Sequence, residues 1–312
     1  MADLQGAPAG DQIGPAVSVR GLRKSYGPVE AVRGLDLEIG RGQIVALLGP
    51  NGAGKTTTME IIEGLRRPDA GEVLVLGEAP EKARRRVGVQ LQEGALYADL
   101  TCAESLTLFG RLYGWDSDSR ALLALVDLAD VADRRTERLS GGQKRRLQLA
   151  LTLCNEPELV ILDEPTTGLD PLSRRQTWAT IERLHRQGRT VLLTTHYIEE
   201  AEQLADWVYI IDEGRVVAQG APTTLIAELG AAASISVAGP PDAHLEDLPG
   251  VLRAEYEGGR WELQGKEVGV ILAALSQRLG EPALRDVAVR PPSLEDVFLA
   301  RTGRHIELEA KA

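Results

Sequence analysis

At residues 49 to 56 the chain reads Gly49-Pro50-Asn51-Gly52-Ala53-Gly54-Lys55-Thr56, which fits the phosphate-loop pattern G-x-x-x-x-G-K-[ST] in full. The loop follows the apolar run Gln43 to Leu48 and precedes a helical pattern from Thr57 to Leu65, the strand-to-helix context that the motif requires. The glycines let backbone N–H groups surround phosphates, Lys55 reaches the outer phosphates, and the Thr56 hydroxyl can bind Mg²⁺. The stretch therefore predicts a nucleoside-triphosphate site.

Further along the chain, short apolar runs alternate with helical patterns. Leu159 to Leu162 runs into Asp163-Glu164, and Thr190 to Thr194 is followed closely by His196. Buried strands that feed helices predict an α/β fold, a phosphate-loop NTPase core with a mostly parallel sheet. We also expect an antiparallel β flank from two segments with stronger alternation, Val17 to Leu22 and Leu35 to Ile39.

The composition of the chain changes at several points, which divides it into regions. Residues 1–15 lack apolar periodicity and indicate a loose N-terminal tail. Residues 16–229 form the expected nucleotide-binding domain, with an inserted helical subdomain at about 93–156. Residues 230–312 predict a small α+β domain, whose amphipathic C-terminal helix is expected to pack on its own sheet. In that region we expect strands at Ser234–Val237, Val251–Tyr256, Arg260–Gln264 and Arg285–Val289, and helices at Glu267–Leu279 and Ser293–Arg301.

The overall charge argues against a nucleic-acid partner. The 312 residues carry a net charge of −11, and the acidic excess is spread along the chain. The short basic clusters Arg84-Arg85-Arg86 and Lys144-Arg145-Arg146 are expected to be solvated. Cys102 and Cys154 lack metal-ligand spacing and indicate a reducing compartment. No apolar run approaches the roughly 18 residues needed to span a bilayer, so we expect contact with a membrane only through a partner.

Two acids follow the second buried run. A strand end presents Asp163 to the phosphate side, where its carboxylate can hold Mg²⁺ through water. Glu164 is placed to act as the general base that orients or deprotonates a water molecule. The alternative is a pair of solvated acids before Pro165, which the complete phosphate loop upstream disfavours.

A second glycine turn, Leu139-Ser140-Gly141-Gly142-Gln143, lies between the phosphate loop and the acidic pair. Ser140 and Gln143 have the spacing of a helix-capping box. A capped helix N-terminus also exposes N–H groups that bind anions, so capping and phosphate recognition are compatible. The turn predicts a second surface that contacts the nucleotide.

These motifs, in this order over residues 17–229, resemble the ATP-binding subunit of ABC transporters. The resemblance implies ATP and Mg²⁺ as ligands and a head-to-tail homodimer, in which the signature of one copy covers ATP on the other. Gln92 is preferred to Gln90 as the glutamine that touches Mg²⁺ and faces the membrane partner. The implied roles are adenine stacking for Tyr26, nucleotide binding for Gly49 to Thr57, catalysis for Glu164, His196 and Gln92, metal binding for Thr56, Gln92 and Asp163, the signature in trans for Ser140, Gly141, Gly142 and Gln143, and the D-loop for Asp170.

The form of the motifs narrows the resemblance to the drug-resistance subfamily typified by daunorubicin exporters. It rests on Thr56-Thr57-Thr58-Met59, on the signature as far as Arg146, and on Pro292 to Leu299. It implies a subunit at the cytoplasmic face of the cell membrane, which powers export of a small amphipathic or hydrophobic compound through a separate integral-membrane permease. Two alternatives remain open: a different cargo such as a polysaccharide, ion or lipid, and a soluble ABC ATPase outside transport.

Overall fold

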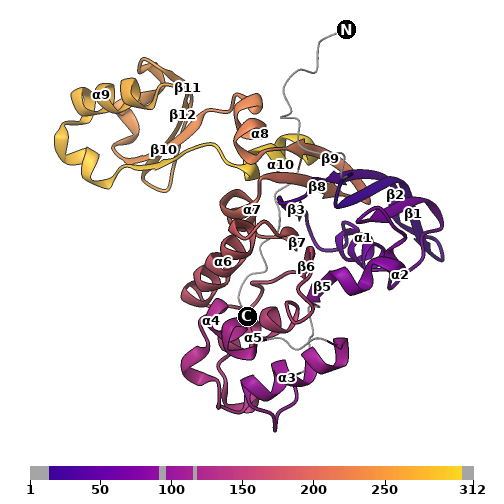
Figure 1. Cartoon of the computed structure of the whole chain (residues 1–312). Coiled ribbons are helices and arrows are strands. Elements are labelled where there is room, and N and C mark those ends of the chain that lie inside the picture. The colour runs from indigo at the N-terminus through magenta and orange to yellow at the C-terminus, as the bar shows by residue number, and fades with distance from the viewer. Residues whose placement is uncertain (1–13, 91–95, 115–117, 304–312) are drawn as a thin grey trace. The chain divides into compact units, whose positions relative to one another are not determined.

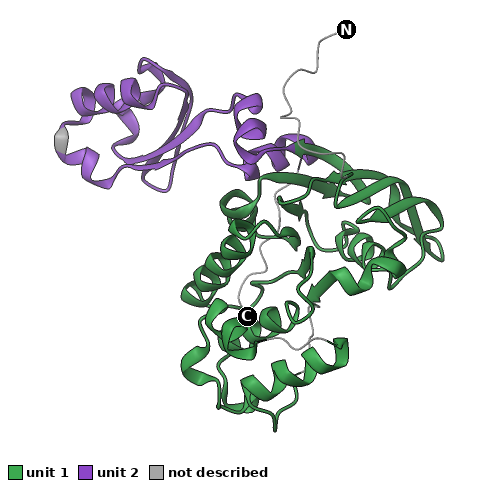
Figure 2. Cartoon of the chain, viewed as in Figure 1, with its two compact units in different colours: residues 1–219, 310–312 green, residues 220–309 purple. Residues whose placement is uncertain are grey.

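The structure is a computed structural model that describes residues 14–90, 96–114 and 118–303. The chain divides into two compact units between Gln219 and Gly220 (Figure 2). Gln92, and residues 1–13 of the expected tail, lie outside the described residues. Over those three ranges, no helix is both long enough and apolar enough to cross a bilayer.

A six-stranded sheet forms the centre of the first unit (Figure 1). Its strands β3, β5, β6, β7 and β8 pair in parallel, and β3, β6 and β7 are buried along their whole length, which confirms the α/β prediction. The order is β5 (Val87–Gln90), β6 (Leu159–Asp163), β7 (Thr190–Thr195), β3 (Ile44–Leu48), β8 (Trp207–Asp212) and β9 (Arg215–Gly220).

A three-stranded antiparallel sheet makes the predicted β flank. Its order is β2 (Val29–Ile39), β1 (Val17–Tyr26) and β4 (Ala70–Val75). Val17, Val19 and Leu22 of β1 are buried in the same core as residues of β3 and β6. The two sheets therefore share one hydrophobic core, which also includes α1 (Lys55–Ile62) and the last residue of α2 (Pro80–Ala83), ahead of the 3₁₀ turn η1 (Arg84–Arg86).

The segment predicted to be helical contains helices with a core of their own. Thr101 and Glu104 form a capping box that starts α3. The elements are α3 (Cys102–Tyr113), α4 (Ser119–Leu125), η2 (Ala129–Val131), η3 (Thr136–Arg138) and α5 (Gly141–Leu151). Both cysteines are buried in this core as free thiols. Helices α6 (Pro171–Arg186) and α7 (Ile198–Leu204) follow β6 and β7 in the chain and complete the first unit.

The second unit contains an antiparallel sheet in the order β11 (Val251–Glu257), β12 (Arg260–Gly265), β10 (Ala233–Ala238) and β13 (Ala288–Arg290). Helix α9 (Val268–Leu279) shares a core with this sheet. The expected strand from Arg285 is shorter, because η6 (Glu281–Asp286) occupies its start. The remaining elements are α8 (Pro222–Leu229), η4 (Pro241–Ala243), η5 (Leu245–Asp247) and α10 (Leu294–Thr302).

The C-terminal helix differs from expectation. Helix α10 packs against α8 rather than on the small sheet. Its apolar residues Leu294, Val297 and Phe298 are buried, as is Leu225 of α8. Helix α9 shares the core of the small sheet, whereas the apolar side of α10 is buried against α8.

Candidate functional site

The phosphate loop joins β3 to α1, and two of its glycines are required by close backbone approach. A Cβ at Gly49 would lie 2.1 Å from the Ile211 carbonyl oxygen, and one at Gly54 would lie 2.5 Å from that of Ala31. Gly54 is also the N-cap of α1, with a φ of 99° that L side chains rarely adopt. The loop therefore has its shape because these positions lack side chains.

Lys55 is held over this loop. Its side chain is buried, and Nζ donates hydrogen bonds to the carbonyl oxygens of Gly49 (2.7 Å) and Pro50 (3.0 Å). Burial lowers the pKa of Lys55, while the negative charges of Glu164 and Asp163 oppose that change. The cation thus lies in the electrostatic field of both acids.

Asp163 ends β6, where it is 7% exposed. The Thr194 hydroxyl donates to Asp163 Oδ1 and accepts from the Glu164 backbone N–H at 3.0 Å. Burial raises the pKa of Asp163, and the Thr194 hydrogen bond opposes this effect. Sequence reasoning missed the role of Thr194, although a threonine near the end of an apolar strand is a usable signal.

Glu164 has an unusual backbone and a defined partner. Its φ is 46°, in the left-handed region that non-glycine residues rarely adopt and that is often found at functional sites. Its Oε1 lies 3.2 Å from His196 Nδ1, and Thr167 Oγ1 donates to Oε2 at 3.1 Å. The His196 hydrogen bond holds the pKa of Glu164 below its usual range, so the carboxylate is ionised at neutral pH. The structure thus brings together Lys55, Asp163, Glu164 and His196.

The signature lies at the N-terminus of α5, and its capping box is present. The Gln143 N–H donates to Ser140 Oγ at 3.2 Å, and the Ser140 N–H donates to Gln143 Oε1 at 3.0 Å. A Cβ on Gly142 would lie 2.2 Å from Ser173 Oγ, so this glycine allows α5 to approach α6. Asp170 caps α6 by accepting from the Leu172 and Ser173 N–H groups at 3.0 Å.

The basic cluster at Lys144 to Arg146 differs from expectation. Arg145 and Arg146 are buried rather than solvated. Arg145 donates to the carbonyl oxygens of Pro165 (2.9 Å), Asp163 (3.0 Å) and Glu164. A planar fork with five donors can satisfy several carbonyls at once, which explains why an arginine is buried here.

The other predicted residues make contacts of their own. Tyr26, at the end of β1, is 40% exposed, and its ring centroid lies 5.4 Å from the Arg66 guanidinium carbon and 5.9 Å from Lys24 Nζ. Asp170 and the signature residues Ser140 and Gln143 form their hydrogen bonds within the caps of α6 and α5. In the phosphate loop Thr56 is exposed and Thr57 is half-buried.

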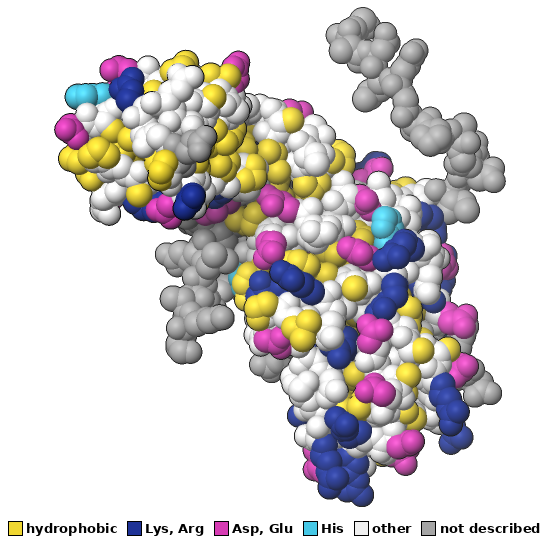
Figure 3. All heavy atoms as spheres, turned by 90° about the vertical axis from the view of Figure 1, so that its left-hand side faces the viewer, with side chains coloured by type: hydrophobic (Ala, Val, Ile, Leu, Met, Phe, Trp, Pro, Cys, Tyr) yellow, Lys and Arg dark blue, Asp and Glu magenta, His cyan; other side chains and the backbone are white. Residues whose placement is uncertain are grey.

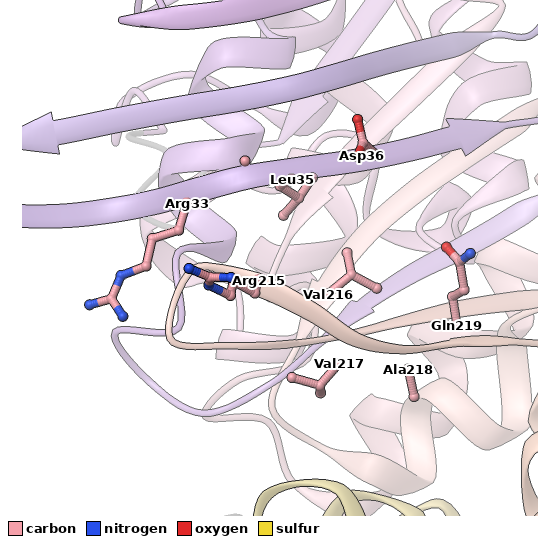
Figure 4. Close-up of a pocket in the computed structure, with 9 residues that line it drawn as sticks. Arg33, Leu35, Asp36, Arg215, Val216, Val217, Ala218 and Gln219 are labelled. Atoms are coloured by element: carbon pink, nitrogen blue, oxygen red, sulfur yellow. The ribbon is translucent and has the colours of Figure 1, made fainter.

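A separate cavity of about 420 Å³ lies between β2 and β9 (Figure 4). It is lined by Arg33, Gly34, Leu35, Asp36, Arg215, Val216, Val217, Ala218 and Gln219. It includes no residue of the phosphate loop or the acidic pair, so it does not define the candidate site.

Comparison with known proteins agrees with this geometry. The ABC transporter family model matches residues 32–167. The chain is 42% identical over 303 residues to the Nod factor export ATP-binding protein I of Paraburkholderia xenovorans strain LB400, covering 94% of this chain and 98% of that protein. The protein of the same name from Rhizobium sp. strain N33 is 40% identical, with the same coverage of both chains.

Solved structures match about two thirds of the chain. The cbiO1 protein of Clostridium perfringens, part of the ABC transporter complex cbiONQ, has a TM-score of 0.63 at 28% identity and covers 69% of this chain and 92% of its own. A dimeric post-hydrolysis structure of the ATP-binding cassette MJ0796, with ADP and Pi, has a TM-score of 0.59 at 26% identity, covering 66% and 98%. Together with the phosphate loop, the acidic pair and the near full-length relatives, these matches show that the chain belongs to the ATP-binding, ATP-hydrolysing subunits of ABC transporters.

Proposed function

We propose that this ATPase hydrolyses ATP at a site built from Gly49 to Thr57 of one copy and from Ser140 to Gln143 of a second copy. The observation that carries the proposal is the pairing of Glu164 with His196 beside Lys55 and Asp163. It places an ionised carboxylate next to a fixed cation and an imidazole. That combination suits attack of water on a phosphoryl group.

In this proposal each residue has one task. Lys55 neutralises charge on the outer phosphates, Glu164 accepts the proton of the attacking water, and His196 contacts the γ-phosphate. Tyr26 stacks on the adenine ring, which an exposed tyrosine near the end of β1 is free to do.

Mg²⁺ is the proposed metal, bound by Thr56, Asp163 and Gln92. Mg²⁺ in phosphate sites takes one or two carboxylates together with phosphate oxygens and water, and the buried carboxylate of Asp163 together with the exposed Thr56 suits that requirement. A bound Mg²⁺ would neutralise charge that develops on the β- and γ-phosphates.

A symmetric homodimer follows from the proposed site, because one chain carries both the phosphate loop and the signature. The dimeric MJ0796 cassette with ADP and Pi supports this arrangement for a relative. ATP would join the two copies, and loss of the γ-phosphate would remove the contacts of Ser140 and His196. Hydrolysis would then open the dimer.

A permease contact is proposed at the helical segment of the first unit. A cavity of about 250 Å³ is lined by Leu96, Ala98, Thr136, Glu137, Lys144 and Gln148. Tyr97, between the lining residues Leu96 and Ala98 in the chain, is 60% exposed, and exposed aromatic side chains are enriched at protein interfaces. We place the subunit at the cytoplasmic face of the membrane, held there by the permease through this surface and Gln92.

Export of a small amphipathic or hydrophobic compound is the proposed task. The names of the relatives state export, which supports outward transport as the direction. Cargo contacts would lie in the permease, so another cargo such as a polysaccharide, ion or lipid is the second candidate. On the face shown in Figure 3 acidic and basic side chains are interspersed, in keeping with a partner other than nucleic acid.

The substitution Glu164→Gln tests the catalytic assignment. Because an amide cannot accept the proton, we expect the turnover number to fall at least about 100-fold, while the Kd for a fluorescent ATP analogue changes less than about threefold. The control is Glu199→Gln, at an exposed position of α7, which should retain parent activity. Parent-rate hydrolysis by Glu164→Gln would show that another group is the base.

A further inference from the structure

Helix α7 carries a buried acid that has no role in the proposed site. Glu200 is fully buried, and its Oε1 accepts hydrogen bonds from Thr166 Oγ1 at 2.8 Å and from Trp178 Nε1 at 3.0 Å. Burying a carboxylate is costly unless hydrogen bonds compensate for lost hydration. Glu200 is therefore expected to fix the position of the groups that it binds.

Both hydrogen-bond donors belong to the part of the chain that follows Glu164. Thr166 lies two residues after Glu164, in the turn that leads to Asp170. Trp178 is buried on α6, the helix that Asp170 caps. A displacement of the Asp170 turn would therefore strain two hydrogen bonds of one carboxylate.

On its other side, Glu200 adjoins the turn that carries His196. Burial raises the pKa of Glu200, while the hydroxyls of Thr195 and Thr166 and the Trp178 indole oppose this. Thr195 Oγ1 accepts from the Tyr197 N–H at 2.9 Å, and the rings of His196 and Tyr197 lie 4.1 Å apart. Thr195 and Tyr197 flank His196 in the chain, so the imidazole lies on the turn that leads directly into α7 and Glu200.

A second contact joins the same two elements. The guanidinium carbon of Arg174, one turn into α6, lies 4.6 Å from the centroid of the Tyr197 ring. Helix α6 and the His196 turn are thus joined at two places, of which only the Glu200 contacts are fully buried.

We propose that Glu200 is a positioning residue, which locks the His196 turn to the segment from Thr166 to α6 so that His196 and Asp170 move together. The proposal rests on the role of His196 in the proposed function. Its consequence is that the γ-phosphate contact and the contact with the second copy would change as one event. Because Glu200 is fully buried within one copy, the proposal gives it no contact of its own with ATP or with the second copy.

The test compares Glu200→Ala, Glu200→Gln and Thr166→Val, with Glu199→Gln as the control on the same helix. Glutamine keeps the Oε1 acceptor for both Thr166 and Trp178, whereas alanine removes it and valine at 166 removes one donor. We expect kcat, normalised to bound nucleotide, to fall at least about tenfold for alanine and about threefold for valine. Glutamine should retain at least about half of the parent rate, and KM should change less than about twofold in all four variants.

A double substitution separates this role from simple stabilisation. If Glu200 acts through His196, Glu200→Ala should lower kcat less than about twofold when His196 is already alanine. Additive losses, or an unchanged kcat in nucleotide-binding Glu200→Ala, would overturn the inference. If Glu200→Ala binds no nucleotide, Thr166→Val decides, and its parent-like kcat would also overturn the inference. Full activity of His196→Ala alone would instead refute the proposed function.

Discussion

Single residues set the electrostatics of the site, and one of them is the buried acid Glu63. It lies at the end of α1 and is 7% exposed. Burial, and then the charges of Asp163 and Glu60, raise the pKa of Glu63 from 4.5 to about 7. The folded chain therefore binds this proton more tightly than the unfolded chain, and its stability decreases as pH rises from 4.5 to about 7.

Removing this charge should stabilise the protein at high pH only. Glu63→Gln is expected to raise the free energy of unfolding by up to about 3 kcal/mol at pH 8, at about 1.4 kcal/mol for each pH unit between the two pKa values. At pH 4.5 the substitution should change the free energy by less than about 1 kcal/mol. Urea unfolding followed by circular dichroism measures both, with the exposed Glu81→Gln as control. Equal effects at the two pH values would contradict the raised pKa.

For single residues, the spacing of the motifs predicts which residues form the site better than it predicts which residues contact each other. Lys55, Asp163, Glu164 and His196 were all expected from sequence, and the structure brings them together. Their roles stay predictions. Thr194 was missed because its hydrogen bond to Asp163 joins two strands that are adjacent in the sheet and 31 residues apart in the chain.

At the scale of elements, helix α5 connects the signature to the acidic strand end. Ser140 caps its first turn, and Arg145, one turn later, donates to the backbone after β6. The run Lys144-Arg145-Arg146 predicted a solvated helix face. Two of its three residues are instead buried against backbone carbonyls that lie far away in the chain, which the local sequence does not reveal. Helix α5 thus holds the backbone from Asp163 to Pro165 in place through the hydrogen bonds of Arg145.

Arg145→Lys should disturb this element while it keeps the charge. Lysine cannot reproduce the fork of donors that meets three carbonyl oxygens, so we expect a loss of about 2 kcal/mol in the free energy of unfolding and at least about a tenfold lower kcat. Steady-state kinetics and urea unfolding measure these effects. Arg120→Lys, on the exposed surface of α4, is the control and should match the parent. If Arg145→Lys has the kcat and stability of the parent, α5 does not support the catalytic segment.

Strands and helices were predictable wherever the apolar pattern was regular. The parallel core strands β3, β6 and β7 follow directly from short apolar runs, and the antiparallel flank from alternation. The packing partner of α10 was not predictable, since an amphipathic helix shows which side is buried but not which element covers it.

At the scale of the whole molecule, the proposed site needs a second copy. Within one copy, the signature residues Ser140 and Gln143 bond to each other in the cap of α5, and the phosphate loop lies between β3 and α1. Dimerisation and a membrane permease are expected from membership of the family. Composition alone argues only against broad classes of protein, such as those that bind nucleic acid. The small second unit has a core of its own and is covered by the Nod factor export relatives, so it belongs to the common architecture of these proteins.

The most direct test of the composite site is the mass of the Glu164→Gln variant with ATP, measured by light scattering with and without Ser140→Arg. Slow hydrolysis should trap Glu164→Gln as a dimer of twice the 33.6 kDa chain mass. The double variant should stay monomeric yet bind ATP with a Kd within about threefold of the single variant, because Lys55 and the phosphate loop are intact. A double variant that dimerises equally well, or that loses ATP binding as a monomer, would contradict a site shared between two copies.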